Sequence, residues 1–330
     1  PAAAAMLADM GAQVIKVEPP LRGDAIRGYL GFMGGIQPTD VKMNYAHEFE
    51  NRGKKSVGVD ISRPEGREVV CRLVESVDVM VTNLLPKRQE KYRLRYEDLL
   101  PLNPRLVYLA VTGYGMLGLE RDRPGFDYAA FWAHSGIMGT IGEAGCPPTM
   151  QRPGMGDHIT SIAGLAGVLA ALYERERSGK GQLVDCSLAG TAPWVLSLDI
   201  SATLLTRRGL PKGSRKEVGN PLFNCYQAAD GRWIQVVMIQ SELYWAPFCR
   251  ALGREDLLRD ERFQTHQDRW RYNKELIGIL DETFATRTME EWAKALDAEG
   301  VIWAPVHTLD EVIEDPQLRA NDAFFPLHHP

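Results

Sequence analysis

The sequence predicts an α/β fold, with a large domain built on a doubly wound parallel sheet and a smaller α+β domain after it. Short β-branched runs alternate with helical segments in the first part of the chain, as in parallel sheets that are covered on both faces. A basic stretch with Gly and Pro but no periodicity, 206–220, marks a boundary. Asp230-Gly231, a strong turn pair for a hairpin, follows it. We therefore expect a large domain at 1–206 and a small domain at 207–306.

The strands of the large domain are expected where short apolar runs follow helical segments. An Ala-rich helix closed by Gly11 precedes the first run, and Ser62 with Pro64 begins a helix after the second, which is a favoured helix entry. The runs at Val77 and Leu106 are rich in β-branched residues, as expected for buried parallel strands. The four expected strands are Gln13–Val17, Lys55–Asp60, Val77–Val81 and Leu106–Val111.

The next segments alternate in the same way. Ile159–Tyr173 is apolar on almost every side, so we expect a helix that is buried all round. A further strand, Gln182–Leu188, and another buried helix, Ala189–Leu205, should follow. After the boundary, the hairpin is expected at Phe223–Ala228 and Arg232–Ile239, with helices after it and a last strand at 301–306.

Composition excludes several classes of protein. The chain has 330 residues, 45% of them hydrophobic, and a net charge of −5, which gives no electrostatic reason to expect nucleic acid as a partner. The five cysteines are scattered without a C-x-x-C pair, so we expect a reduced, cytoplasmic protein without a metal site. No apolar stretch approaches the ~20 residues of a bilayer span, so no membrane association is expected. The chain begins with Pro1, and we expect it to be part of a longer protein.

Asp157 is the candidate with the most chemical interest. It lies in RPGMGDH, directly before the long apolar helix. An Asp at a helix start is commonly a cap that stabilises the helix by about 1 kcal/mol. The alternative is a functional carboxylate, because Gly154 and Gly156 would let a ligand approach the backbone. Such a carboxylate can form a mixed anhydride with a thioester. The residues alone leave both interpretations open.

Basic residues stand at or just after the ends of the predicted strands. Ligands of open α/β sheets bind at that edge, so these residues could contact phosphates, although solvated surface charge is the simpler explanation for any one of them. Asn83, directly after VDVMVT, would also face this edge. The basic residues are Lys16, Arg52, Lys54, Lys55, Lys87, Arg88 and Lys91.

An ordered set of motifs over nearly the whole chain resembles the class III CoA-transferase family, which also contains the 2-methylacyl-CoA racemases. The motifs are AAAMLADMGAQVIKVEPP with GDAIRG, NRGKKSVGVDISRPEGRE, VDVMVTNLLP, LNPRLVYLAVTGYG, RPGFDYAAFWAHSGIM, GDHITSIAGLAGVLAALYERERSGKGQLVDCSL and NPLFNCYQAADGRWIQV. The resemblance implies a Rossmann-like large domain and two subunits interlocked as a homodimer. It also implies that 307–330 begins a C-terminal return to the large domain, cut short here.

The resemblance places the family's catalytic aspartate at Asp157. The residues that contact the ADP part of coenzyme A fall on Val59, Asn83 and Lys91, and Arg52, Lys87 and Arg88 become candidates for its phosphates. Gly219 lies where transferases carry a glycine-rich catalytic loop, although a single Gly stands there. Coenzyme A and acyl-CoA are then substrates, and no permanently bound cofactor is expected.

Two departures favour the transferases over the racemases. The racemases use a histidine in a G-H-D motif as a proton-transfer base, and this chain has Phe126 between Gly125 and Asp127. Gln240 stands where they carry a glutamate. A racemase needs a base on each face of the α-carbon, so Phe126 argues against it.

The resulting hypothesis is transfer of CoA from an acyl-CoA thioester to a free carboxylic acid. Asp157 would form a mixed anhydride and then an aspartyl-CoA thioester, and Asp127 would position groups near the thioester. Two alternatives stay open: a racemase or isomerase that uses Asp157 as a base, and a CoA- or partner-binding module without chemistry.

Overall fold

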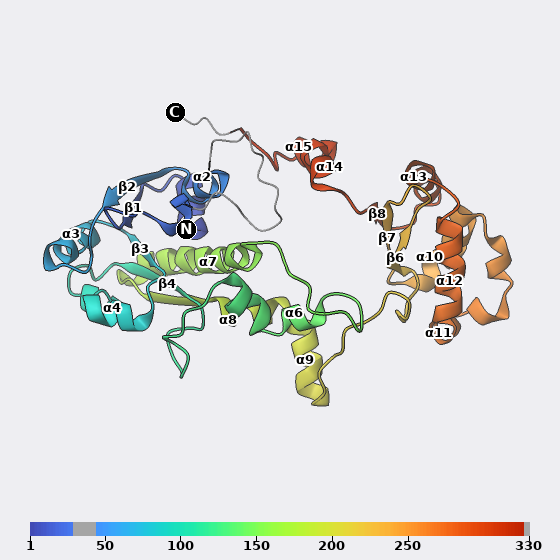
Figure 1. Cartoon of the computed structure of the whole chain (residues 1–330), viewed down its shortest axis with the longest axis horizontal. Helices are drawn as coiled ribbons and strands as arrows, with labels where there is room; N and C mark the ends of the chain where they lie inside the picture. The colour runs from blue at the N-terminus through green and yellow to red at the C-terminus, as the bar shows by residue number, and fades with distance from the viewer. Residues whose placement is uncertain (29–43, 327–330) are drawn as a thin grey trace. The chain divides into compact units, whose positions relative to one another are not determined.

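The computed structural model describes residues 1–28 and 44–326, and the chain separates into two compact units (Figure 1). Unit 1 comprises 1–141 and 146–211, and unit 2 comprises 142–145 and 212–330. The last four residues of the expected return segment, 307–330, lie outside the described residues.

Unit 1 has a mixed α/β fold with parallel sheets, as the sequence predicted. The first sheet pairs β1 (Val14–Glu18) with β2 (Lys54–Gly58). The second has the order β3-β4-β5, formed by β3 (Val79–Thr82), β4 (Val107–Thr112) and β5 (Leu183–Ser187). Every described strand pair of unit 1 is parallel. The expected strands are therefore present, but their hydrogen bonds form two sheets instead of one.

The surroundings of strand β4 account for the apolar residues at its consecutive positions. Val107 and Leu109 pack into one hydrophobic cluster, with residues of α1 (Ala2–Asp9) and α7 (Met155–Ser178). Tyr108 and Ala110 pack into a second cluster, with residues of α3 (Pro64–Val74). Because successive side chains of a strand point to opposite faces, β4 is covered by helices on both.

The helices of unit 1 begin and end where local signals allow. Pro64 stands in the first turn of α3, as expected from its fixed φ. Gly179, with φ +71°, ends α7 in the left-handed conformation that glycine adopts readily. The helical elements are α1 (Ala2–Asp9), the 3₁₀ turn η1 (Ala25–Gly28), α2 (Tyr45–Asn51), α3 (Pro64–Val74), α4 (Pro86–Tyr92), α5 (Tyr96–Leu99), the π-helical segment η2 (Asp127–Ala133), α6 (Ile137–Thr140), α7 (Met155–Ser178), α8 (Leu188–Val195) and α9 (Ser197–Thr206).

Two predictions about buried helices are wrong. Helix α7 buries Leu165 and Val168 against the sheet but exposes Ile162 and Tyr173 on its other side. The second expected helix divides into α8 and α9, which meet at 80°. Pro193 lies inside α8 and removes a helix hydrogen bond shortly before the bend. No residue of α9 is buried. The apolar sequence of these helices therefore does not correspond to complete burial within this chain.

The expectation that no segment could cross a membrane was too strict. By length and composition, α7 qualifies among the described residues, and α8 with α9 would qualify if the bent pair formed one span. A core helix can meet the same criterion, and part of α7 packs on β4 and β5 (Figure 1).

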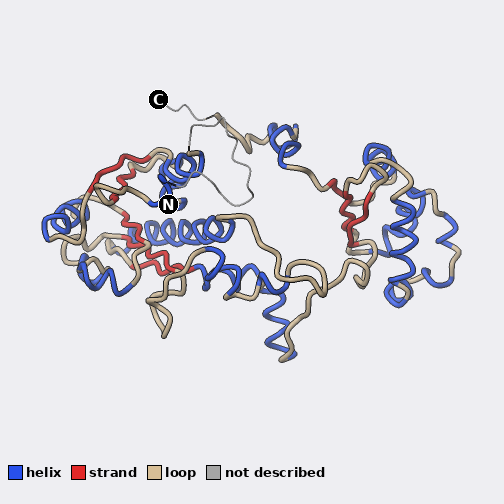
Figure 2. The backbone as a smooth tube through the Cα atoms, viewed as in Figure 1, coloured by secondary structure: helices blue, strands red, loops and turns tan. Residues whose placement is uncertain are grey.

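Unit 2 contains an antiparallel sheet with the order β6-β7-β8. The hairpin predicted at Asp230-Gly231 is present, and Gly231 has φ +81°. In Figure 2 the strands lie beside the helices of the same unit. The strands are β6 (Phe223–Gln227), β7 (Trp233–Val237) and β8 (Trp303–Pro305), and the helical elements are α10 (Ser241–Leu252), the 3₁₀ turns η3 (Glu255–Leu258) and η4 (Glu261–Phe263), α11 (His266–Arg271), α12 (Asn273–Phe284), α13 (Met289–Ala298), α14 (Leu309–Glu314) and α15 (Pro316–Ala320).

Candidate active site

Asp157 is the third residue of α7, the long helix of unit 1. The residue that caps this helix is Gly154, whose φ of +78° is strained for any residue with a side chain. Asp157 is exposed, so a ligand can reach its carboxylate. It also lies in the first turn, where the positive end of the helix dipole favours negative charge. The simple capping interpretation of Asp157 is therefore not what the structure shows.

Asp127 supplies the hydrogen bond that a capping side chain would normally make. Its Oδ2 accepts a hydrogen bond of 2.9 Å from the Gly154 N–H, although the two residues are 27 positions apart. Asp127 is the first residue of η2 and is only 4% exposed. A Cβ on Gly156 would overlap both the Asp127 carboxylate and the Phe131 ring. Glycine at this position thus allows the π-helical segment to lie against the start of α7.

The surroundings of Asp157, including the charge of Asp127, raise its affinity for protons. The pKa of Asp157 is raised to about 6, first because protein atoms displace water around its carboxyl group and second because Asp127 is negatively charged. Burial also raises the pKa of Asp127, and hydrogen bonds to its carboxylate only partly offset this effect. At neutral pH Asp157 is still mostly ionised, and it is more basic than an ordinary aspartate. An accessible carboxylate of this kind is suited to act as a nucleophile.

A histidine–glutamate pair that the sequence analysis did not identify lies beside Asp157. His158 Nε2 is 2.7 Å from Oε1 of Glu50, which lies on α2. The hydrogen bond to Glu50 raises the pKa of His158. Burial alone would raise the pKa of Glu50, but the hydrogen bond with His158 lowers it overall. Each partner therefore favours the charged form of the other. Only the position of His158 directly after Asp157 could have drawn attention to it in the sequence.

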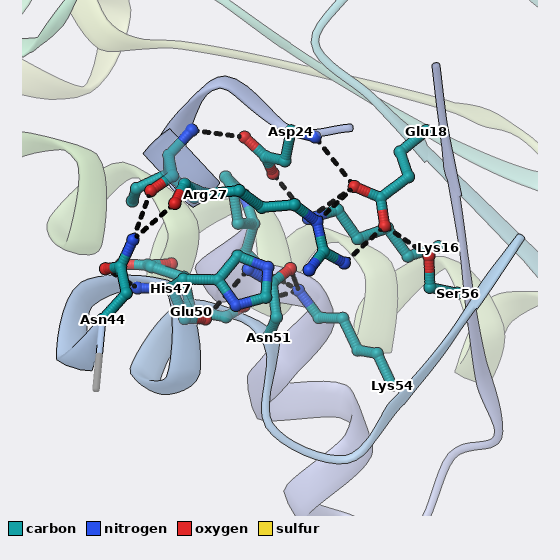
Figure 3. Close-up of polar contacts among 12 residues, drawn as sticks. Lys16, Glu18, Asp24, Arg27, Asn44, His47, Glu50, Asn51, Lys54 and Ser56 are labelled. Atoms are coloured by element: carbon teal, nitrogen blue, oxygen red, sulfur yellow. Dashed lines mark hydrogen bonds and ion pairs between the residues drawn. The ribbon is translucent and has the colours of Figure 1, made fainter. Parts of the chain in front are cut away.

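A second polar network, drawn in Figure 3, surrounds the end of β1. The Glu18 carboxylate accepts two hydrogen bonds from Arg27, of 2.9 and 2.6 Å, and one from the Ser56 hydroxyl. These hydrogen bonds hold the pKa of Glu18 far below its usual range, and those from Arg27 have the largest effect. Lys16 pairs with Asp24 at 2.5 Å. The network joins β1, β2 and η1, and its charges are largely matched within it.

The other expected ligand-binding residues of unit 1 follow its strands. Val59 is buried directly after β2, and its N–H donates to the main-chain oxygen of Glu18 at 2.9 Å. Asn83 is exposed directly after β3. Three basic residues are exposed on α4, which begins three residues beyond Asn83. They are Lys87, Arg88 and Lys91.

Arg52 and Gly219 are engaged in other contacts. Arg52 ends α2, and its guanidinium binds the Asp9 carboxylate at 2.5 Å. Gly219 lies in unit 2, where a Cβ would come within 3.0 Å of the Trp270 indole.

The residues at the racemase positions are not acids or bases. Phe126 is 81% exposed directly before η2, and Gln240 is the residue before α10. Within residues 1–28 and 44–326, no cluster of three or more His, Cys, Asp or Glu side chains could hold a metal ion. The chemistry of the site therefore centres on its carboxylates.

Relatives with known structures share this fold. A CaiB/BaiF family protein from Brucella suis has a TM-score of 0.83 at 30% identity, and the match covers 97% of this chain and 83% of that one. The Rv3272 protein of Mycobacterium tuberculosis has a TM-score of 0.85 at 27% identity, and the match covers 100% of this chain and 88% of that one.

Relatives with assigned activities are CoA-transferases. The chain is 34% identical to a (R)-2-hydroxy-4-methylpentanoate CoA-transferase from Clostridioides difficile, over 98% of this chain and 80% of the relative. It is also 34% identical to a cinnamoyl-CoA:phenyllactate CoA-transferase from Clostridium sporogenes, over 100% of this chain and 80% of the relative. The model of the family "CoA-transferase family III" matches residues 1–330. The chain therefore belongs to CoA-transferase family III and is a CoA-transferase.

Proposed function

We propose that Asp157 is the nucleophile that carries CoA transfer in this chain. The observation that supports this role most strongly is an exposed carboxylate at the start of α7 whose pKa is raised to about 6. The Asp157 carboxylate attacks the donor thioester, forms a mixed anhydride and expels CoA thiolate. The thiolate then attacks the aspartyl carbonyl, which releases the donor acid and leaves an aspartyl-CoA thioester. The acceptor carboxylate repeats these steps in reverse.

In this proposal Asp127 is a positioning residue. Its carboxylate holds the Gly154 N–H at 2.9 Å and so fixes the backbone directly before Asp157. Its charge also contributes to the raised pKa of Asp157. Asp127→Asn keeps an oxygen that can accept the Gly154 hydrogen bond but removes the charge. We expect the acid limb of the pH–rate profile to move to lower pH in this variant.

The test of the nucleophile is the Asp157→Asn variant. We expect turnover to fall by at least about 1,000-fold and the hydroxamate that hydroxylamine forms at Asp157 in the wild-type enzyme to disappear, as read by peptide mass spectrometry. Asp199→Asn is a matched control, because Asp199 is the third residue of α9 just as Asp157 is of α7. Transfer at the wild-type rate by Asp157→Asn would contradict the proposal.

We also propose that the carboxyl edge of the parallel strands holds coenzyme A. Val59 and Asn83 directly follow β2 and β3, and Lys87, Arg88 and Lys91 add positive charge on α4. Arg52 is a weaker phosphate ligand because it already binds Asp9. We also propose that Gly219 of unit 2 belongs to the glycine-rich catalytic loop that the family resemblance implies. Lys91→Ala should raise KM for the acyl-CoA without changing the site of hydroxamate formation, whereas Arg72→Ala on α3 should leave KM unchanged.

For the acids, we propose 2-hydroxycarboxylic acids with apolar side chains. The support is the pair of relatives named for 2-hydroxy-4-methylpentanoate and phenyllactate, each 34% identical. A panel of acyl-CoA donors and carboxylic acids, read by mass spectrometry, tests this class. Transfer restricted to dicarboxylates would contradict it.

We propose further that unit 1 is a Rossmann-like, doubly wound domain and that two chains interlock as a homodimer. The support for a partner is the apolar surface of α8 and α9, where Trp194, Leu198 and Leu205 are at least 80% exposed. Leu198→Asp with Leu205→Asp should yield monomers in light-scattering measurements. A cytoplasmic location, with no resident cofactor and no membrane or nucleic-acid partner, completes the proposal, and it agrees with scattered cysteines that form no C-x-x-C pair in the sequence.

A further inference from the structure

His158 and Glu50 have no task in the mechanism above, yet they lie directly beside its nucleophile. His158 follows Asp157 in the first turns of α7, and its ring is held by two neighbouring residues of α2. Glu50 accepts the Nε2 hydrogen bond at 2.7 Å, and Phe49 packs edge-on against the ring at 5.6 Å between centroids. The ring is therefore fixed in place by contacts from another helix.

The pair leaves one end of the imidazolium available. The Glu50 side chain is only 15% exposed, whereas that of His158 is 41% exposed. Nε2 is bound to Glu50, and Nδ1 makes no hydrogen bond to any residue within 1–28 or 44–326. A protonated histidine carries a donor on both nitrogens. When His158 is protonated, the ring thus carries a positive charge held by Glu50 and has an N–H group at Nδ1, directly after Asp157 in the chain.

Three other cationic side chains in this part of unit 1, those of Lys16, Arg27 and Lys54, are bound to other groups of the chain. The three protons of Lys54 Nζ are shared among two main-chain oxygens and Asn51, at 2.9, 2.6 and 3.4 Å. Lys16 and Arg27 each pair with a carboxylate, at 2.5 and 2.6 Å. His158 differs from them because its side chain is 41% exposed and, among the described residues, only Nε2 makes a side-chain hydrogen bond.

We propose that His158, kept protonated by Glu50, is a catalytic residue that stabilises the CoA thiolate expelled by Asp157. This inference rests on the function proposed above. When the Asp157 oxygen bonds to the acyl carbon, the C–S bond breaks and its electron pair leaves on sulfur. The imidazolium stabilises that charge and holds the thiolate for its return attack on the aspartyl carbonyl. That attack forms a new C–S bond, and the donor acid leaves as a carboxylate, so no net proton is consumed.

The charged groups around His158 are consistent with this role. Glu50 approaches it from α2, Asp157 from its own helix and Asp127 from η2, and all three carboxylates favour the protonated ring. The hydrogen bond to Glu50 is the strongest of these influences on the pKa of His158. Because Glu50 binds Nε2, its removal should lower the pKa of the histidine without removing the ring itself.

The decisive experiment measures the pH dependence of the first half-reaction. Acyl transfer to Asp157 is followed in single turnovers, with acyl-CoA in the absence of acceptor acid and with hydroxylamine as the trap. His158→Gln should slow this step on the order of 100-fold. In Glu50→Gln the glutamine oxygen can still accept the Nε2 hydrogen bond, but the alkaline limb of the profile should move to lower pH. The sign follows because a histidine whose pKa falls loses its charge at lower pH.

The controls separate this role from that of a structural link between α2 and α7. His307 and Glu311 form a similar pair in unit 2, with Nδ1 and Oε2 3.6 Å apart. His307→Gln and Glu311→Gln should leave rate and profile unchanged. A merely structural Glu50–His158 pair would lower the amount of active enzyme but not move the alkaline limb. Circular dichroism shows whether His158→Gln is misfolded. If it is, the pH profile of Glu50→Gln alone distinguishes the catalytic role of His158 from a structural one.

Two outcomes overturn the inference. A Glu50→Gln profile identical to wild type, or a wild-type rate in His158→Gln with hydroxamate still formed at Asp157, overturns it alone. A wild-type enzyme that never yields hydroxamate at Asp157 overturns the proposed function, and this inference falls with it.

Discussion

Unit 2 has one large continuous core of buried apolar side chains, whereas those of unit 1 form three separate clusters and its helices α8 and α9 leave large apolar side chains exposed. In unit 2, Trp292, Phe284 and Phe248 are fully buried together. In unit 1, Trp194 on α8 and Leu205 on α9 are 80% and 86% exposed. Large exposed apolar surfaces usually mark an interaction site. The difference indicates that unit 2 has a single core of its own, although Trp270 and Leu309 remain exposed on it, while α8 and α9 of unit 1 present an apolar surface that needs cover from elsewhere.

Helix α7 of unit 1 also begins differently from three helices of unit 2. Helices α11, α13 and α14 of unit 2 start with capping boxes built on Thr265, Thr288 and Thr308. Helix α7 of unit 1 starts with a glycine, and its cap comes from Asp127, far away in the sequence. Local capping favours stability without long-range contacts. The start of α7 depends on tertiary structure, and the candidate nucleophile is located there.

The largest expected effect compares two tryptophans. Trp292 is fully buried, stacks near Phe284 at 5.0 Å between ring centroids and donates its indole N–H to the Phe284 carbonyl. Trp292→Ala should lower the free energy of unfolding by about 3–5 kcal/mol. Trp194→Ala, on the exposed surface of α8, should change the free energy of unfolding of the dissociated chain by less than about 0.5 kcal/mol. Urea unfolding followed by circular dichroism measures both.

Equal destabilisation by Trp194→Ala and Trp292→Ala would break the comparison, because it would mean that the α8 surface is packed as tightly as the core of unit 2. Measurements at several protein concentrations separate the loss of subunit contacts from the loss of chain stability.

The next effect compares two helical glycines. A Cβ on Gly156 would overlap the Asp127 carboxylate and the Phe131 ring, so Gly156→Ala should destabilise unit 1 by about 1–3 kcal/mol and reduce transfer. Gly278 of α12 has nothing within 4 Å of its Cβ position. Gly278→Ala should therefore stabilise unit 2 by about 0.5–1 kcal/mol through helix propensity. Opposite signs of the two shifts in melting temperature are the expected result, and a stabilising Gly156→Ala would show that η2 can move away from α7.

A smaller effect tests local capping. The Thr288 hydroxyl accepts from the Glu291 N–H, and the Glu291 carboxylate accepts from the Thr288 N–H at 2.8 Å. Thr288→Ala should lower the free energy of unfolding by about 1 kcal/mol and leave transfer activity unchanged. Thr288→Asn is the matched control, since Asn caps as well as Thr. A loss of activity without a loss of stability would contradict the view that capping in unit 2 is purely structural.

The same contrast explains how much could be predicted from the sequence. The strands, the hairpin at Gly231 and the helix entry at Pro64 follow from local signals, and each is present. The cap by Asp127 and the pair of Glu50 with His158 join residues 27 and 108 positions apart. No periodicity or spacing encodes such contacts. The exposed face of α7 was not predicted for a related reason. Apolar composition indicates that a helix is buried, but it does not indicate whether the same chain or another one buries it.

The smallest effect concerns the stability cost of the nucleophile itself. The pKa of Asp157 is about 6 in the folded chain, above its ordinary value of 3.8, chiefly because protein atoms displace water around its carboxyl group although the residue as a whole is exposed. The folded state therefore binds a proton more tightly than the unfolded state between these values, and stability contributed by this group falls as pH rises through that window. Asp157→Asn should raise the melting temperature by a few degrees at pH 7.5 and leave it nearly unchanged at pH 3.5, where both forms are neutral. Asp199→Asn should show no such difference between the two pH values. If Asp157→Asn were instead less stable at pH 7.5, its charge would be favoured by the fold, and the start of α7 would resemble the self-sufficient helix starts of unit 2.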